Sequence, residues 1–102
     1  MPEKLTEEDF ARQLNSKFRV RAATPRPLEL ELVEVKSWRS GAAEQSGMER
    51  FSLFFTGPAD IFLPQQSYTL EHEQLGVLDI FLVPVARTAE EMRYEAVFNF
   101  YR

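Results

Sequence analysis

Residues 68–83 read YTLEHEQLGVLDIFLV, and this stretch decides the fold. Its first half alternates apolar and polar side chains from Tyr68 onward, which is the two-residue period of a β-strand with one buried face. A glutamine, a leucine and Gly76 then supply a turn, because glycine suits the left-handed position that closes a three-residue hairpin loop. The pattern predicts a hairpin in which Leu70 pairs with Ile80 on the buried face.

The second strand of this hairpin, residues 77–83, is apolar on both faces except at Asp79. We therefore expect a central or helix-covered strand, and we expect it to end at Pro84 because proline donates no ladder hydrogen bond. The same register places Glu71 opposite Asp79. The apolar contacts of the hairpin should outweigh this like-charge pair, which water screens.

The two-residue period begins with residues 17–21, where basic side chains alternate with Phe18 and Val20. We expect these basic side chains to form the solvent face of a strand, and not a nucleic-acid site. In residues 28–35 the apolar side chains change parity near Leu32, which predicts either a β-bulge or a strand covered on both faces. We favour a bulge near Leu32 and Val33.

A helical pattern precedes the strands, over about residues 6–15. Thr6 is a suitable N-cap, and Phe10 and Leu14 lie four residues apart, on the same side of such a helix. The helix is too short to be stable alone, so we expect this apolar side to dock on the rest of the chain.

Two further strand patterns, at residues 51–55 and 92–101, bring the expected number of strands to about six. The sequence predicts a single domain over residues 1–102, with the helix at about 6–15 and a β region over about 17–102. Its fold class is mainly β, either a small antiparallel, partly closed barrel or a two-layer sandwich. We favour the barrel because two strands look covered on both sides and the helix could plug one end.

Composition limits the function. The chain has 102 residues, a net charge of −4 and no cysteine. The acidic balance argues against nonspecific nucleic-acid binding, and the lack of cysteine excludes disulfides and thiolate metal sites. No apolar run is long enough for a membrane helix, and no signal peptide is apparent. We expect a soluble, cytoplasmic protein without membrane or nucleic-acid partners.

Chemistry that uses imidazole would have to involve His72, the only histidine. Glu71 and Glu73 flank it, but neighbouring strand residues point to opposite faces, so a metal site is not expected. Ser67, His72 and Asp79 are the residue types of a nucleophilic triad, yet the sequence has no nucleophile elbow and no phosphate-binding glycine loop. We expect no catalytic, cofactor-binding or metal-binding residue. The residues favour a protein that is not an enzyme, and a structural role for His72.

Several segments occur in an order and spacing that resemble a small family of uncharacterised bacterial domains. These segments are FSLFFTGP at 51–58, LPQ at 63–65, YTLEH at 68–72, FLVPV at 81–85 and MRYEAVFN at 92–99. The resemblance implies a bacterial origin and one small domain, and no activity is assigned to the family. It also implies a setting near phage-tail-like assemblies.

The first functional hypothesis is a noncatalytic interaction or assembly module of a bacterial protein complex. The loop at residues 59–66 is unusually apolar, and with a tryptophan at a strand end it could form an exposed patch. The residues of this patch would be Trp38, Ile61 and Phe62. Alternatively, the loop folds over an open end of the barrel and buries these side chains, and we favour this burial.

The second hypothesis is a small-molecule-binding or enzymatic barrel. Its pocket would lie near the rim of the hairpin, where Tyr68, His72 and Tyr94 could converge with nearby carboxylates. A protein, either another chain or a second copy, is the partner that the sequence favours.

Overall fold

The computed structural model describes residues 7–21, 27–37 and 48–101. Its elements in chain order are a helix and six strands: α1 (Glu7–Ala11), β1 (Lys17–Arg21), β2 (Leu28–Ser37), β3 (Met48–Pro58), β4 (Gln66–His72), β5 (Gly76–Arg87) and β6 (Glu91–Tyr101). The chain is therefore mainly β, with one short N-terminal helix, as the sequence predicts.

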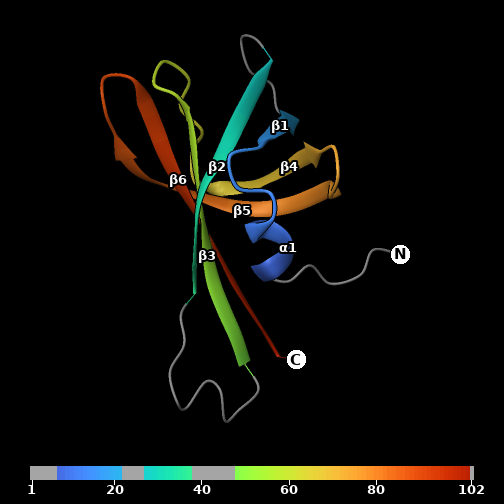
Figure 1. The fold of residues 1–102 in the computed structure, drawn as a ribbon. Helices are drawn as coiled ribbons and strands as arrows, with labels where there is room; N and C mark the ends of the chain where they lie inside the picture. The colour runs from blue at the N-terminus through green and yellow to red at the C-terminus, as the bar shows by residue number, and fades with distance from the viewer. Residues whose placement is uncertain (1–6, 22–26, 38–47, 102) are drawn as a thin grey trace.

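The six strands form a closed barrel in the order β1-β2-β3-β6-β5-β4. Every neighbouring pair is antiparallel. Four of the pairs join consecutive strands, whereas β3–β6 and β1–β4 join strands that are distant in the chain. Figure 1 shows β4 and β5 extending to one side of β3, with α1 in the space between β5 and the lower part of β3. The barrel, and not the two-layer sandwich, is the architecture of this chain.

Every second side chain along β1 points into the barrel, and these apolar side chains help to fill its interior. In β1 the burial pattern alternates strictly, with Phe18 and Val20 inside and the three basic residues outside, as expected. Phe18 meets the ring of Phe55 edge-on, with 5.3 Å between the ring centroids. The other large buried side chains of the strands include Leu30, Leu32, Phe51, Leu53, Leu70, Leu82 and Tyr94.

The helix closes one end of the barrel through a single aromatic residue. Phe10 is buried, and its ring centroid lies 6.0 Å from that of Phe51 and 5.5 Å from that of Phe98. The rings of Phe51 and Phe98 are themselves stacked at 5.0 Å. These three rings fix the position of a helix that would not be stable alone.

The helix is shorter than the sequence pattern indicates, because it ends at Ala11 and turns follow it. Leu14 is exposed, so its expected place on the buried side of the helix is wrong. The cause is Asn15, which has a φ of 71° and donates a backbone hydrogen bond of 2.6 Å to Leu32. The chain must leave the helical path here to reach β2. Thr6 lies outside the described residues.

The hairpin of β4 and β5 forms with a different register from the expected one. Tyr68 pairs with Ile80, Leu70 with Leu78, and the pairing continues to Gly76. The loop therefore starts one residue earlier than expected, and Gly76, with a φ of 84°, belongs to the last rung. The displacement along the partner strand is two residues, so every side chain keeps its predicted face.

The like-charge pair of the expected hairpin does not occur. Glu71 pairs with Val77, and Asp79 pairs with Thr69. The Thr69 hydroxyl donates a hydrogen bond of 2.8 Å to the Asp79 carboxylate. The observed register thus replaces a repulsion with a hydrogen bond.

The pairing register shifts at two places among the described strands, one in β2 and one in β5. The expected bulge in β2 is confirmed, because the register shifts between Leu32 and Glu34. A second shift lies between Pro84 and Ala86, and β5 continues beyond it to Arg87. The expectation that Pro84 ends the strand is therefore wrong, because proline is tolerated at such an irregularity.

The expectation that β5 is covered on both faces is also wrong. Its inner face is buried at Ile80 and Leu82. On its outer face, Val77, Phe81 and Val85 are 58%, 50% and 45% exposed. A second apolar face in the sequence thus indicates an uncovered surface in this barrel.

Substitutions at Phe98 and at its neighbour Val97 test how much the cluster of Phe10, Phe51 and Phe98 contributes to stability. Phe98→Ala removes a ring that packs on Phe10 and Phe51, so we expect a loss of about 3 kcal/mol in the free energy of unfolding. Val97 points outward, and Val97→Ala should cost less than about 1 kcal/mol. Urea unfolding measures both values. Equal losses would contradict the inward placement of Phe98.

Candidate functional site

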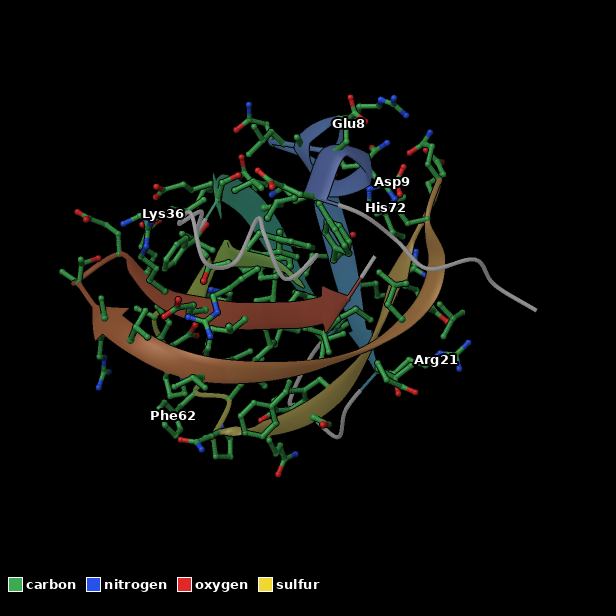
Figure 2. All side chains as sticks on the ribbon, turned by 90° about the horizontal axis from the view of Figure 1, so that it is seen from below. Glu8, Asp9, Arg21, Lys36, Phe62 and His72 are labelled. Atoms are coloured by element: carbon green, nitrogen blue, oxygen red, sulfur yellow. The ribbon has the colours of Figure 1, made fainter. Side chains whose placement is uncertain are left out.

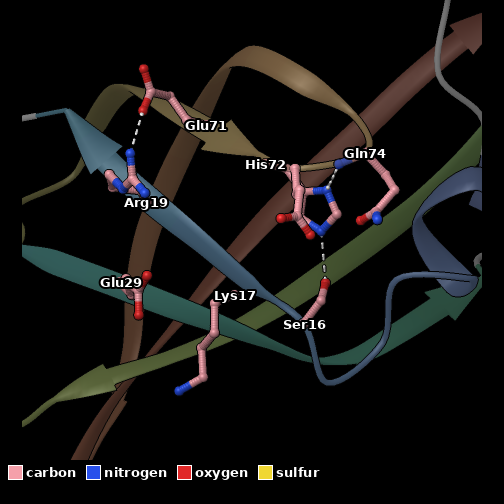
Figure 3. A pocket seen from close by; sticks show the side chains of 8 residues that line it. Ser16, Lys17, Arg19, Glu29, Glu71, His72 and Gln74 are labelled. Carbon is pink, nitrogen blue, oxygen red and sulfur yellow. Dashed lines mark hydrogen bonds and ion pairs between the residues drawn. The ribbon is translucent and has the colours of Figure 1, made fainter.

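A pocket of about 430 Å³ lies at the end of the barrel where β1 begins and β4 ends. Its walls come from the start of β1, from Glu29 of β2, and from the end of β4 with its turn (Figure 3). His72 lies in this wall, and its side chain is nearly fully buried. The pocket is where the structure places the only histidine, so its chemistry depends on the hydrogen bonds of that ring.

Both nitrogens of the His72 ring are occupied. Nδ1 accepts hydrogen bonds from the backbone N–H groups of Gln74, at 3.0 Å, and Leu75, at 3.1 Å. Nε2 lies 2.8 Å from the hydroxyl of Ser16, which in turn donates to the carbonyl of Gln13 at 2.5 Å. Because Nδ1 accepts, the ring proton of neutral His72 is on Nε2, and Ser16 accepts it.

This arrangement is unsuited to nucleophilic catalysis. A serine nucleophile needs a base that takes its proton, whereas here the histidine donates to the serine. The hydroxyl proton of Ser16 points toward Gln13, away from the imidazole. His72 instead joins the turn after β4 to the segment before β1, which is a structural role.

Burial lowers the pKa of His72, and the nearby Glu73 carboxylate partly opposes this shift. The two backbone donors at Nδ1 act in the same direction as burial, because a protonated Nδ1 cannot accept their hydrogen bonds. The ring is also 4.3 Å from that of Phe18, between centroids, in the apolar interior. The environment of His72 therefore favours the neutral form of its ring.

The charged groups around the pocket largely neutralise one another. Arg19 lies 3.3 Å from a carboxylate oxygen of Glu71, and Arg21 contacts the other oxygen of that carboxylate. Lys17 lies 3.9 Å from Glu31. The basic residues of β1 are thus paired with acidic ones on neighbouring strands. Among the described residues, no cluster of His, Asp or Glu could hold a metal ion.

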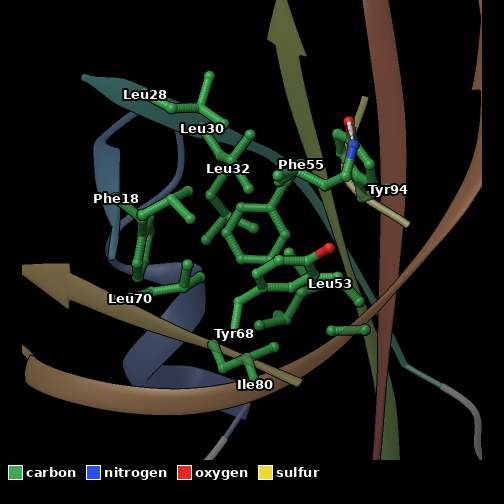
Figure 4. Close-up of a cluster of buried hydrophobic side chains, with 14 of the residues drawn as sticks. Phe18, Leu28, Leu30, Leu32, Leu53, Phe55, Tyr68, Leu70, Ile80 and Tyr94 are labelled. Carbon is green, nitrogen blue, oxygen red and sulfur yellow. Dashed lines mark hydrogen bonds between the residues drawn. The ribbon is translucent and has the colours of Figure 1, made fainter. Parts of the chain in front are cut away.

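The two tyrosines proposed for the pocket lie elsewhere. The Tyr94 hydroxyl accepts a hydrogen bond of 3.1 Å from the backbone N–H of Leu63 and lies 3.4 Å from the carbonyl of Ile61 (Figure 4). The Tyr68 hydroxyl donates to the carbonyl of Pro64 at 2.5 Å. Burial raises the pKa of both phenols. Both fasten the loop after β3, and neither lines the pocket beside His72.

The same loop contains most of the patch proposed from sequence. Ile61 is 6% exposed and buried in the core, whereas its neighbour Phe62 is 60% exposed. Figure 2 shows Phe62 on the far side of the molecule from His72. Trp38 lies outside the described residues. The favoured burial of the patch therefore holds for Ile61 and is wrong for Phe62.

The larger apolar surface was not identified from sequence. It consists of Val77, Phe81 and Val85 on the outer face of β5, with Val97 on the outer face of β6. The sequence does contain a sign of this surface, because residues 77–83 are apolar on both faces of the strand except at Asp79. Whether the second face is covered depends on what packs over the strand, which periodicity does not report.

Tyr94→Phe tests how the loop is fastened. The substitution leaves the buried N–H of Leu63 without its acceptor, so we expect a loss of about 1–3 kcal/mol in the free energy of unfolding. Tyr68→Phe is the matched control, because its hydroxyl is only partly buried and should cost about 1 kcal/mol. Chemical unfolding of both variants provides the comparison. Wild-type stability in Tyr94→Phe would rule out this role.

The lowered pKa of His72 predicts a pH dependence of stability. In the unfolded chain histidine has a pKa near 6.5, so the unfolded state binds more protons as the pH falls through this value. The contribution of His72 is therefore complete above that pH and is lost on acidification toward the lower pKa of the folded state.

His72→Gln removes this titration and leaves every carboxylate in place. Urea unfolding at about pH 7.5 and about pH 5 should show a larger loss of stability in the wild type than in the variant. Losses of the same size would show that His72 does not carry the pH dependence.

Among the described residues, no helix is long and apolar enough to cross a membrane. No curated protein and no solved structure matches the chain. Residues 5–98 match DUF6916, a domain of unknown function. This match spans nearly the whole barrel, from just before α1 into β6. The chain therefore belongs to the DUF6916 family.

Proposed function

We propose that this domain is a noncatalytic interaction module that binds a protein partner through the outer faces of β5 and β6. The observation that supports the proposal is the exposed apolar surface of Val77, Phe81, Val85 and Val97. Single exposed apolar residues are ordinary, but three on the outer face of one strand form a surface of the kind that partners cover. Val97 lies on the outer face of β6, two positions beyond the last residue of β6 that pairs with β5. We call these four residues the β5 face.

Phe81 is the best anchor on the β5 face. It is half exposed, and its partner on β4 is Ser67, whose small side chain leaves the ring open. Val97 similarly pairs with Ser52 of β3. Aromatic side chains at the centre of an interface contribute much of its binding energy, and covering the exposed half of Phe81 would contribute about 1 kcal/mol.

Charge around the Val77 and Phe81 half of the β5 face favours a basic partner, whereas Arg87 and Arg93 lie near its Val85 end. Asp79 lies between Val77 and Phe81 on the outer side of β5, and Glu95 of β6 pairs with Val83. The whole chain carries a net charge of −4. Opposite charge at the rim of an interface raises the association rate and restricts the partners. The setting that we propose is a bacterial protein complex of the phage-tail-like kind.

The pocket beside His72 supports a second candidate, the binding of a small polar molecule. Its volume of about 430 Å³ is within the range of ligand sites. The engaged nitrogens of His72 and the paired arginines leave few groups free to bind, so we rank this function second. A small molecule that co-purifies and is lost in Glu29→Gln would favour it.

A photo-crosslinking residue in place of Phe81 tests the interaction. Benzoylphenylalanine keeps an aromatic ring at this position, and irradiation of the source cells should give a covalent adduct with a defined protein. The matched control carries the same residue at Glu90, an exposed position in the turn between β5 and β6. An adduct at position 81, absent at 90, is expected. Equal labelling at the two positions, or none at 81, would exclude the β5 face.

A further inference from the structure

The pairing of β5 is divided between two neighbours. Gly76–Leu82 pair with β4, and from Val83 onward the strand pairs with β6. β6 pairs with β3 along its whole length, but its rungs to β5 begin at Val83. In Figure 1 the two strands accordingly part at the centre of the molecule.

The Gly76–Leu82 segment therefore has one strand neighbour and one open edge. Within the described residues, no rung joins this segment to β6. The helix α1 lies mainly against β2 and packs through Phe10 onto Phe51 and Phe98, so it does not pair with this edge. Along an antiparallel strand, alternate N–H and C=O groups point to each side. The open edge thus presents a row of backbone donors and acceptors.

We propose that this β5 edge accepts an extended segment of another protein as an additional strand. The inference rests on the proposed function and specifies how the partner binds. An extended backbone is the ligand whose spacing of donors and acceptors matches a strand edge. Main-chain hydrogen bonds would then supply affinity, and the side chains beside them would supply the choice of partner.

Side chains of the edge define the partner sequence. Val77 and Phe81 lie two positions either side of Asp79 on the exposed face, and an added strand would place its own side chains against them. Among the described residues, Asp79 has the Thr69 hydroxyl as its partner and no cationic one. The fitting segment is therefore apolar, basic, apolar at alternate positions, with the lysine or arginine opposite Asp79.

A second copy of this chain fits the edge less well. In an antiparallel self-pair that joins Phe81 of one copy to Val77 of the other, the two Asp79 carboxylates would face each other. Like charges directly opposite each other destabilise a strand pair, and charges on edges are a common protection against self-association. A heterologous partner is thus the occupant that the charge favours.

Amide hydrogen exchange of the full chain provides the first test. In the free protein, every second amide of Gly76–Leu82 should exchange at least about tenfold faster than its neighbours that bond to β4. Uniform protection of this segment in the free protein would mean that the edge is already covered, and would overturn the inference.

Two capped synthetic peptides provide the second test, acetyl-TVTKTVT-amide and its control acetyl-TVTETVT-amide. The lysine peptide should bind with a roughly millimolar Kd and slow the exchange of the open-edge amides. The glutamate peptide should bind more weakly, and Asp79→Lys should reverse this order. Glu90→Lys makes the same change of charge in the exposed turn between β5 and β6, outside the β5 face, and should bind both peptides as the wild type does.

Three results would overturn strand addition. One is no binding by the lysine peptide, another is protection of amides outside Gly76–Leu82, and the third is a peptide preference that Asp79→Lys leaves unchanged. Protection of the same amides by self-association at high concentration would assign the edge to a second copy, which also contradicts the proposal.

The two proposals fail in different ways. A partner that crosslinks at position 81 but leaves the edge amides exchanging freely would retain the interaction function and exclude strand addition. Peptide binding at the edge without any cellular adduct at position 81 would retain the edge as a binding site and exclude the proposed cellular function.

Discussion

Closure of the barrel depends on β1, its shortest strand. Four rungs join β1 to β2 and three join it to β4, so five residues connect the two ends of the sheet. Phe18 of β1 packs on Phe55 across the interior and on the ring of His72. Loss of this strand would open the core and the pocket together, because both are lined by its two faces.

The buried face of each strand could be predicted from sequence because the two-residue period remains correct when the pairing register is wrong by two residues. The hairpin register was wrong by two residues, yet Tyr68, Leu70 and Ile80 remained inside, since a displacement of two preserves the face. The bulge near Leu32 was visible as a change of parity. The ends of elements were less readable, because tertiary contacts such as that of Asn15 with Leu32 determine where a helix stops.

The candidate site was less predictable than the fold, because its contacts are distant in sequence. Ser16 and His72 are 56 positions apart, and no local pattern links them. Tyr94 and Leu63 are 31 apart. The prediction that β5 is covered on both faces was wrong for another reason. A strand with two apolar faces has the same sequence pattern whether a helix covers the second face or nothing does. Only the arrangement of neighbouring strands distinguishes the two cases.

The contact of Arg19 with Glu71 spans 52 positions, which has a consequence for how the chain folds. The β1–β2, β2–β3, β4–β5 and β5–β6 pairs join strands that follow each other in the chain, whereas β3 pairs with β6 from Met48 and Tyr101 onward, across a separation as long as that of Arg19 and Glu71. Topologies dominated by distant contacts fold slowly. We therefore expect the nascent chain to pass through an unclosed sheet, whose unpaired strand edges are prone to aggregation until β6 emerges from the ribosome.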